Sequence, residues 1–149
     1  MKNLLGWVLV ALQFALLIAL VLVPRREPEA IWVAIGGLLI GAGGAVGFSA
    51  FRALGSALTP TPVPIAGAGL RTEGIYARVR HPIYGAVLLL VFGYVIAFGS
   101  WWSLLVAVIL VIFFAAKARW EDHLLAAAYG SHWVAWASTT GALIPRLRR

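Results

Sequence analysis

The sequence contains no cysteine and only five acidic residues among its 149. The absence of cysteine excludes a disulfide framework, a thiolate metal site and a cysteine nucleophile. Charged residues make up 11% of the chain and hydrophobic residues 62%, which lies far from the composition of soluble domains. Because so few charged groups cannot solvate the surface of a soluble domain, the composition predicts an integral membrane protein. The length predicts a single domain, residues 1–149.

Four apolar runs have the length of membrane-spanning helices, about 20 residues. They cover about residues 4–23, 30–51, 82–99 and 101–118. The first run is too long for a signal-peptide core and lacks a small-residue cleavage site, so we expect it to remain uncleaved. Only Gly99-Ser100 separates the last two runs, which predicts a tight antiparallel hairpin. The predicted fold is all-α, with four transmembrane helices.

The second run is rich in glycine, and two pairs in it have the small-xxx-small spacing of close helix packing. These pairs are Gly37/Gly41 and Gly43/Gly47.

Two segments outside the predicted spans carry most of the polar residues. Residues 52–80 form a long connecting segment whose prolines favour extended backbone. Its apolar residues, among them Ile75 and Tyr76, indicate that it folds back onto the helices. The mixed composition of residues 119–138 predicts a helix that leaves the bilayer and breaks at Gly130. After the break we expect an interfacial helix anchored by tryptophans such as Trp133 and Trp136.

The basic residues predict the orientation. With four spans, both termini and the connecting segment share one side, which holds ten basic residues against two on the other. The positive-inside rule therefore places the termini and the connecting segment in the cytoplasm, in the cell's inner (cytoplasmic) membrane. The formal charge of +7 is thus topological, and we expect no nucleic-acid partner.

The most polar stretch, residues 70–86, ends on Arg80-His81-Pro82 at the start of the third span. Proline is favoured at the first helical position, and the free N–H groups of such a helix start suit an anion. Equal rise along the two helices of the hairpin predicts that Arg80, His81 and Tyr84 face Lys117, Glu121 or Asp122. Ionisable residues at membrane depth favour a functional site. The alternative is an Arg80–Glu121 salt bridge that only clamps the hairpin.

These residues carry a resemblance to a known family. Two spaced motifs and a distant acidic pair carry it: Leu70-x-Thr72-x-Gly74-x-Tyr76, Arg80-His81-Pro82-x-Tyr84 and Glu121-Asp122. Together they resemble the signature of the isoprenylcysteine carboxyl methyltransferase family. The wider group includes phospholipid N-methyltransferases. The similarity covers about residues 45–146.

The resemblance implies an S-adenosylmethionine-dependent methyltransferase whose active site faces the cytoplasm, with the cofactor bound within about residues 66–146. It places Arg80 near the reacting groups, a substrate-side cation at Lys117 or Arg119, and Glu121 among the catalytic residues. The residues expected to hold the cofactor are Ala68, Gly69, Leu70, Arg71, Tyr76, His81, Pro82, Ile83, Tyr84, Glu121 and Asp122.

The acceptor stays open at this point. Arg80 and Lys117 would orient a carboxylate, whereas Glu121, Asp122 or Glu73 would take a proton from an amine. The membrane location predicts the bilayer as a partner and a lipid-like or prenylated small acceptor. The spacing of the three histidines fits no standard zinc pattern, so we expect no metal.

Two other functions compete with methyl transfer. Sterol reductases resemble this family in their C-terminal architecture but use NADPH. A non-catalytic helical membrane protein would use the polar residues only to clamp its hairpin. Binding of S-adenosylmethionine, of NADPH or of neither separates the three.

Overall fold

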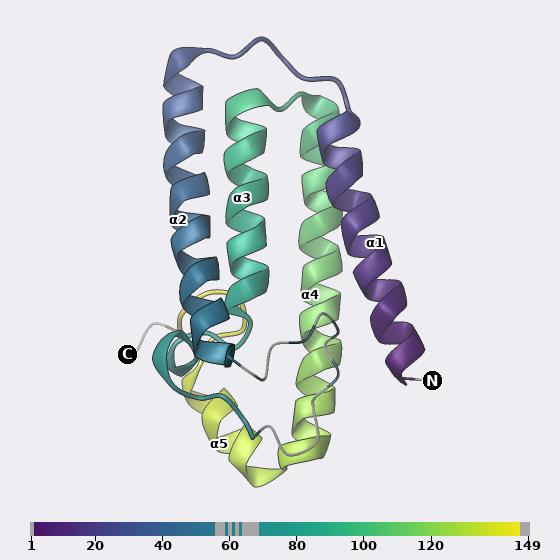
Figure 1. Ribbon diagram of the computed structural model, residues 1–149, viewed down its shortest axis with the longest axis vertical. Coiled ribbons are helices and arrows are strands. Elements are labelled where there is room, and N and C mark those ends of the chain that lie inside the picture. The colour runs from purple at the N-terminus through teal and green to yellow at the C-terminus, as the bar shows by residue number, and fades with distance from the viewer. Residues whose placement is uncertain (1, 56–58, 60, 62, 64–68, 147–149) are drawn as a thin grey trace.

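The computed structural model describes residues 2–55, 59, 61, 63 and 69–146 (Figure 1). Apart from two isolated β-bridges, these residues contain helices and irregular segments but no strand. The helices are α1 (Lys2–Leu22), α2 (Ala30–Leu54), the 3-10 turn η2 (Gly74–Ala77), α3 (Pro82–Phe98), α4 (Trp101–Tyr129) and α5 (Ser131–Thr139).

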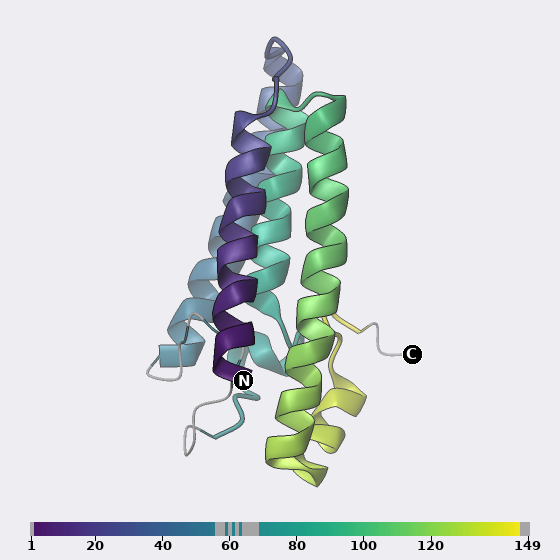
Figure 2. The ribbon, with the colours of Figure 1, turned by 90° about the vertical axis from the view of Figure 1, so that its right-hand side faces the viewer.

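The four long helices form a bundle in which α3 lies between α2 and α4, and α1 packs against α4 (Figures 1 and 2). The core side chains that join α1, α3 and α4 are Leu20, Leu88, Val91, Ala107, Leu110 and Phe114. Many large apolar side chains point outward instead, such as Leu38 on α2, which is 76% exposed. Such an apolar exterior marks a membrane protein.

Helices α1, α2 and α4 are long and apolar enough to cross a membrane. Helix α3 is apolar but has 17 residues, so it lies at the short end of the range for a span. Its ends match the predicted hairpin, because α3 stops at Phe98 and α4 starts at Trp101. The all-helical prediction is confirmed for the described residues, and the crossing by α3 stays a prediction.

Helix α4 is longer than its predicted span, because it continues unbroken past residue 118 to Tyr129. The predicted break at Gly130 is confirmed: this residue has φ +54°, a conformation that glycine adopts readily. A short helix follows as predicted, but the role given to Trp136 is wrong. Its side chain is buried rather than anchored at a surface, and its Nε1 donates a hydrogen bond to the carbonyl of Tyr76 at 2.9 Å.

The connecting segment folds back onto the helices, as its apolar residues predict. Tyr76 and Val79 are buried, and Tyr76 clusters with Ala50 of α2 and Trp136 of α5. Most of the predicted proline-rich extended stretch lies outside the described residues. Figure 1 shows η2, the start of α3, the end of α4 and the start of α1 at the same end of the bundle. This end holds the polar residues of the chain's central motif.

Glycines line the close contact between α2 and α3. A Cβ atom built on Gly36 would collide with the carbonyl oxygen of Gly93, and one on Gly43 would lie 2.9 Å from that of Ala86. The predicted pair Gly37/Gly41 does not take part, since a Cβ on either residue would meet nothing within 4 Å. The small-residue spacing alone did not show which face of α2 meets α3. Gly36, rather than Gly37, lies on the face that contacts α3.

Two neighbouring alanine substitutions test this contact. Gly36→Ala is expected to lower the free energy of unfolding by about 1–3 kcal/mol, because its methyl group collides with backbone that cannot move aside. Gly37→Ala is expected to leave stability unchanged or to raise it slightly, because alanine favours helix and the space beside Gly37 is open. Unfolding of both variants in mixed micelles measures the difference. Equal effects would contradict the observed helix rotation.

Candidate functional site

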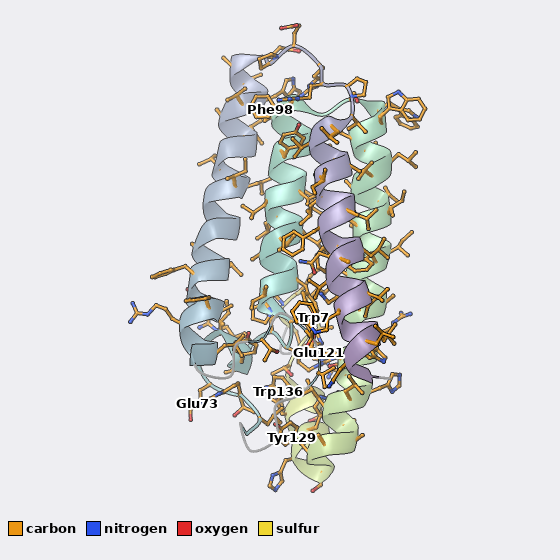
Figure 3. All side chains as sticks on the ribbon, turned by 45° about the vertical axis from the view of Figure 1, so that its right-hand side comes forward. Trp7, Glu73, Phe98, Glu121, Tyr129 and Trp136 are labelled. Atoms are coloured by element: carbon orange, nitrogen blue, oxygen red, sulfur yellow. The ribbon has the colours of Figure 1, made fainter. Side chains whose placement is uncertain are left out.

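Five ionisable or polar side chains meet where α3 begins and α4 passes it. This polar cluster consists of Arg80, His81, Tyr84, Glu121 and Asp122. Figure 3 shows Glu121 toward the end of the bundle that carries Trp136 and Tyr129, far from Phe98 at the other end. The hairpin register therefore brings together residues about 40 positions apart, as equal helical rise predicts.

Glu121 is held by the first turn of α3. The Tyr84 hydroxyl donates a hydrogen bond to Glu121 Oε2 at 2.6 Å, and His81 Nδ1 lies 3.4 Å from the same oxygen. The rings of His81 and Tyr84 stack with centroids 5.4 Å apart. His81 is the N-cap of α3 and Pro82 its first residue, as predicted. One carboxylate oxygen of Glu121 is thus fixed.

Arg80 pairs with Asp122 rather than with Glu121, the partner considered in the clamp hypothesis. Its Nε and Nη2 donate to the two oxygens of Asp122 at 3.2 and 3.0 Å. Its Nη1 donates to the carbonyl oxygens of Thr140 at 2.7 Å and Ala137 at 3.3 Å. Both side chains of the ion pair are mostly buried, with 13% and 16% exposed. The guanidinium therefore links the segment before α3 with α4 and with the C-terminal end of α5.

The segment after α5 completes the cluster, which the sequence did not indicate. The backbone N–H groups of Arg80 and His81 donate to the carbonyl oxygens of Gly141 and Ala142, each at 2.9 Å. The segment is thereby tied to the backbone of the two residues that open α3.

His81 lies between two carboxylates, because its Nε2 is also 3.0 Å from Asp122 Oδ1 and its side chain is only 2% exposed. Burial lowers the pKa of this imidazole, but hydrogen bonds to Asp122 and Glu121 and their negative charges outweigh burial and raise the pKa to about 9. His81 is therefore an imidazolium at neutral pH, and it donates toward both carboxylates.

Stability is expected to fall as the pH rises from about 6.5 to about 9. The pKa of His81 is higher in the folded chain, so its contribution is fully present below the ordinary value of 6.5 and is lost as the pH passes about 9. The loss amounts to roughly 3 kcal/mol. Thermal unfolding in detergent across this range, for the natural chain and for His81→Gln, measures it. The same fall in His81→Gln would contradict the assignment to His81.

Lys117 is buried beside the cluster, with 3% exposed. Its Nζ lies 5.1 Å from the centroid of the Tyr84 ring and donates a hydrogen bond to Gln13 Oε1 of α1 at 2.7 Å. Sequence reasoning missed Gln13, although a signal was present: it is the only amide side chain within the apolar run 4–23. A polar residue inside a span is costly and marks a specific contact.

The structure brings together some of the predicted cofactor residues and not others. Tyr76 is buried, and burial together with the charge of Glu121 raises the pKa of its hydroxyl above the ordinary value, so this hydroxyl stays protonated. Pro82 is buried, and Leu70 and Ile83 pack against the cluster around Tyr76. Gly69 and Arg71 are exposed on the connecting segment.

The remaining predicted residues lie farther from the cluster or beyond description. Ala68 lies outside the described residues. Arg119 and Glu73 are exposed, and Figure 3 shows Glu73 at the outer edge of the molecule. In the part of the chain that the structure describes, no three His, Asp or Glu residues are grouped so as to hold a metal ion.

Apolar helices long enough to span a bilayer, with a buried ionisable cluster at one end, define a membrane protein that carries a polar site. The phospholipid methyltransferase family matches residues 31–132, which is more than half of the chain. The chain therefore belongs to the phospholipid methyltransferase family. The match includes Arg80, His81, Tyr84 and both carboxylates of α4, and it begins after α1. No curated protein matches the chain.

The family confirms the resemblance drawn from the motif, and it implies methyltransferase activity in a membrane.

Proposed function

We propose that the chain is an S-adenosylmethionine-dependent methyltransferase that methylates a carboxylate or amine of a lipid-like acceptor. The observation that carries this proposal is the packing of Glu121 and Asp122 against Arg80, His81 and Tyr84 inside the segment that matches the family. Membership in the family favours methyl transfer over a nicotinamide-dependent reduction.

The residues of the cluster fit this cofactor chemically. Glu121 is 24% exposed, and only its Oε2 is engaged by Tyr84 and His81, so its second oxygen is suited to accept from an ammonium or from ribose hydroxyls. Trp133 Nε1 is buried without a hydrogen-bond partner among the described residues, and the Trp133 ring lies 5.8 Å from the Arg80 guanidinium. This unsatisfied donor beside a cation suits a carboxylate.

Aromatic faces supply the rest of the proposed pocket. Tyr84 and Tyr76 offer rings for the adenine or for the sulfonium, which is attracted to π-systems. Leu70, Pro82 and Ile83 provide apolar walls around them. When bound, the cofactor supplies an activated methyl group on a positively charged sulfur. Gly69 and Arg71, on the exposed connecting segment, are proposed to close the pocket from outside.

The two cations of the site are proposed to act differently. The Arg80 guanidinium is already engaged by Asp122 and by two carbonyl groups, so it is proposed to position Asp122 and His81 beside the reacting groups. Lys117 has one hydrogen bond, to Gln13, and its other two donors have no acceptor among the described residues. We therefore assign the orientation of an anionic acceptor to Lys117.

If the acceptor is an amine, a carboxylate of the cluster would accept the proton that the amine loses. Glu121 is the better placed base, because both oxygens of Asp122 are engaged by Arg80 and His81, whereas Tyr84 and His81 engage only Oε2 of Glu121. In either case the side chains hold acceptor and methyl group close together and exclude water, which is the main requirement of an in-line methyl transfer.

The same proposal includes the topology. The chain is proposed to cross the membrane four times, which is supported by the parallel course of α1 to α4 (Figure 1). The polar cluster and both termini are proposed to lie in the cytoplasm, because the end of the bundle that holds the cluster carries the surplus of basic residues. The acceptor would then reach the cluster from the inner membrane itself.

Transfer of a labelled methyl group tests the activity. The purified chain in bicelles of mixed membrane lipids is incubated with S-adenosylmethionine that is tritiated on its methyl group, and the lipid fraction is counted. Label is expected in one lipid class with the natural chain. If that lipid is an anionic acceptor, Lys117→Met is expected to lower its labelling at least tenfold. Folded natural chain that labels no lipid, in the full set of phospholipids, fatty acids and isoprenoid acids, would contradict the proposal.

A further inference from the structure

A second feature at the polar end of the bundle is an open groove between the last turns of α2 and η2. Its volume is about 820 Å³, and its rim carries two arginines, Arg52 of α2 and Arg78 directly after η2. Phe48, Ser49 and Gly74 complete the side that faces outward. The groove lies apart from the polar cluster, because its walls Ala53 and Ile75 pack against the apolar group around Tyr76 and Trp136.

Neither of these two arginines forms an ion pair within the part of the chain that the structure describes. All five acidic side chains lie in the described residues, so each can be accounted for. Glu27 and Glu29 belong to the connection between α1 and α2, at the opposite end of the bundle (Figure 1). Glu121 and Asp122 are engaged by the polar cluster.

Glu73 is the one remaining acid near the groove, and it is exposed and directed away from the bundle (Figure 3). Within the described residues the ion pairs join only Arg80 and His81 to carboxylates, so neither Arg52 nor Arg78 has one. Two cations on one groove favour an anion from outside the chain.

The surroundings of the groove indicate which anion. A guanidinium presents a planar fork of donors that matches phosphate oxygens, and Ser49 adds a hydroxyl. Arg52 lies 5.7 Å from the ring of Phe48, which is itself 62% exposed, and Leu38 farther along α2 is exposed as well. A ligand with a phosphate at one end and long apolar chains beside it fits both surfaces.

We propose that this groove binds the phosphodiester group of an anionic phospholipid, with the acyl chains lying along the outward face of α2. Basic pockets beside membrane helices bind such headgroups. A headgroup that carries an amine is disfavoured, because its positive charge would meet two guanidinium groups. The groove is therefore a lipid site separate from the proposed methyl-transfer site, and it does not depend on that activity.

Native mass spectrometry of the full chain, delipidated in detergent and supplied with phosphatidylglycerol, tests the proposal. The natural chain is expected to retain the lipid. Arg52→Gln/Arg78→Gln is expected to bind it roughly tenfold or more weakly, because two charges near the phosphate are lost. Each single substitution is expected to give an intermediate loss. Arg25→Gln, which removes an exposed arginine between α1 and α2 at the opposite end of the bundle, is the matched control and is expected to bind like the natural chain.

Three further measurements separate the sources of the binding. Diacylglycerol, which has the chains but no phosphate, and phosphatidylcholine are expected to bind less than phosphatidylglycerol. Inorganic phosphate at the same concentration is expected not to displace the lipid. Retention that is unaffected by the double substitution, equal retention of diacylglycerol, or displacement by inorganic phosphate would each overturn the proposal. Because all the substituted side chains are exposed, unchanged thermal unfolding is expected to show that the variants fold.

Discussion

Replacing Asp122 by alanine is expected to lower the free energy of unfolding by about 3 kcal/mol, the lower end of the cost of unpairing a buried charge. The substitution leaves the Arg80 guanidinium without its carboxylate and removes one of the two anions that hold His81 as an imidazolium. Two carbonyl oxygens, of Ala137 and Thr140, still accept from Arg80 and limit the loss. Unfolding in mixed micelles measures the effect.

A double-mutant cycle is the control for this result. Arg80→Ala alone is expected to cost a similar amount, and the double variant clearly less than the sum, because the two side chains interact directly. Glu73→Ala, which removes an exposed carboxylate outside the cluster, is expected to be neutral. Additive effects of Arg80→Ala and Asp122→Ala would contradict the ion pair.

The second large effect is expected at Gln13, on the helix that lies outside the match to the family. Gln13→Leu removes the one hydrogen-bond acceptor of the Lys117 ammonium among the described residues and leaves a buried charge without this partner. The free energy of unfolding is expected to fall by about 2 kcal/mol. Lys117→Met, which removes the charge itself, is expected to be nearly neutral for stability while lowering methyl transfer to an anionic acceptor at least tenfold.

The double variant decides whether the cost at Gln13 arises from Lys117. In the Lys117→Met background, Gln13→Leu is expected to be neutral or stabilising, because no buried ammonium is left to satisfy. A loss of stability in that background as large as in the natural chain would show that Gln13 acts through another contact.

The sequence predicted the parts of the site that follow from helix geometry. The hairpin has only two residues between its helices, so the rise per residue sets which positions of α4 lie beside the start of α3. The contact between Tyr84 and Glu121 is one of those that this register allows, because it places Tyr84 opposite Lys117, Glu121 and Asp122. The motif around Arg80-His81-Pro82 also predicted the family, because its spacing is specific.

Contacts that depend on helix rotation and on non-helical chain were not predictable in the same way. The rotation of α4 decides that Arg80 meets Asp122 rather than its neighbour Glu121, and the rotation of α2 decides that Gly36 rather than Gly37 meets α3. The carbonyl groups of residues 140–142 carry no signal in the sequence, because any residue provides them. Gln13 was visible as a lone amide, but nothing in the sequence connected it with Lys117.

The central claim, that the polar cluster holds S-adenosylmethionine, is tested most directly by calorimetric binding of S-adenosylhomocysteine to the purified chain. Saturable binding is expected for the natural chain and for Glu73→Gln, whose carboxylate lies outside the cluster. Glu121→Gln is expected to weaken binding about tenfold to a hundredfold, because the amide loses the negative charge that strengthens a hydrogen bond to the cofactor. Absence of binding to the folded natural chain in lipid bicelles, or equal binding by Glu121→Gln, would contradict the claim.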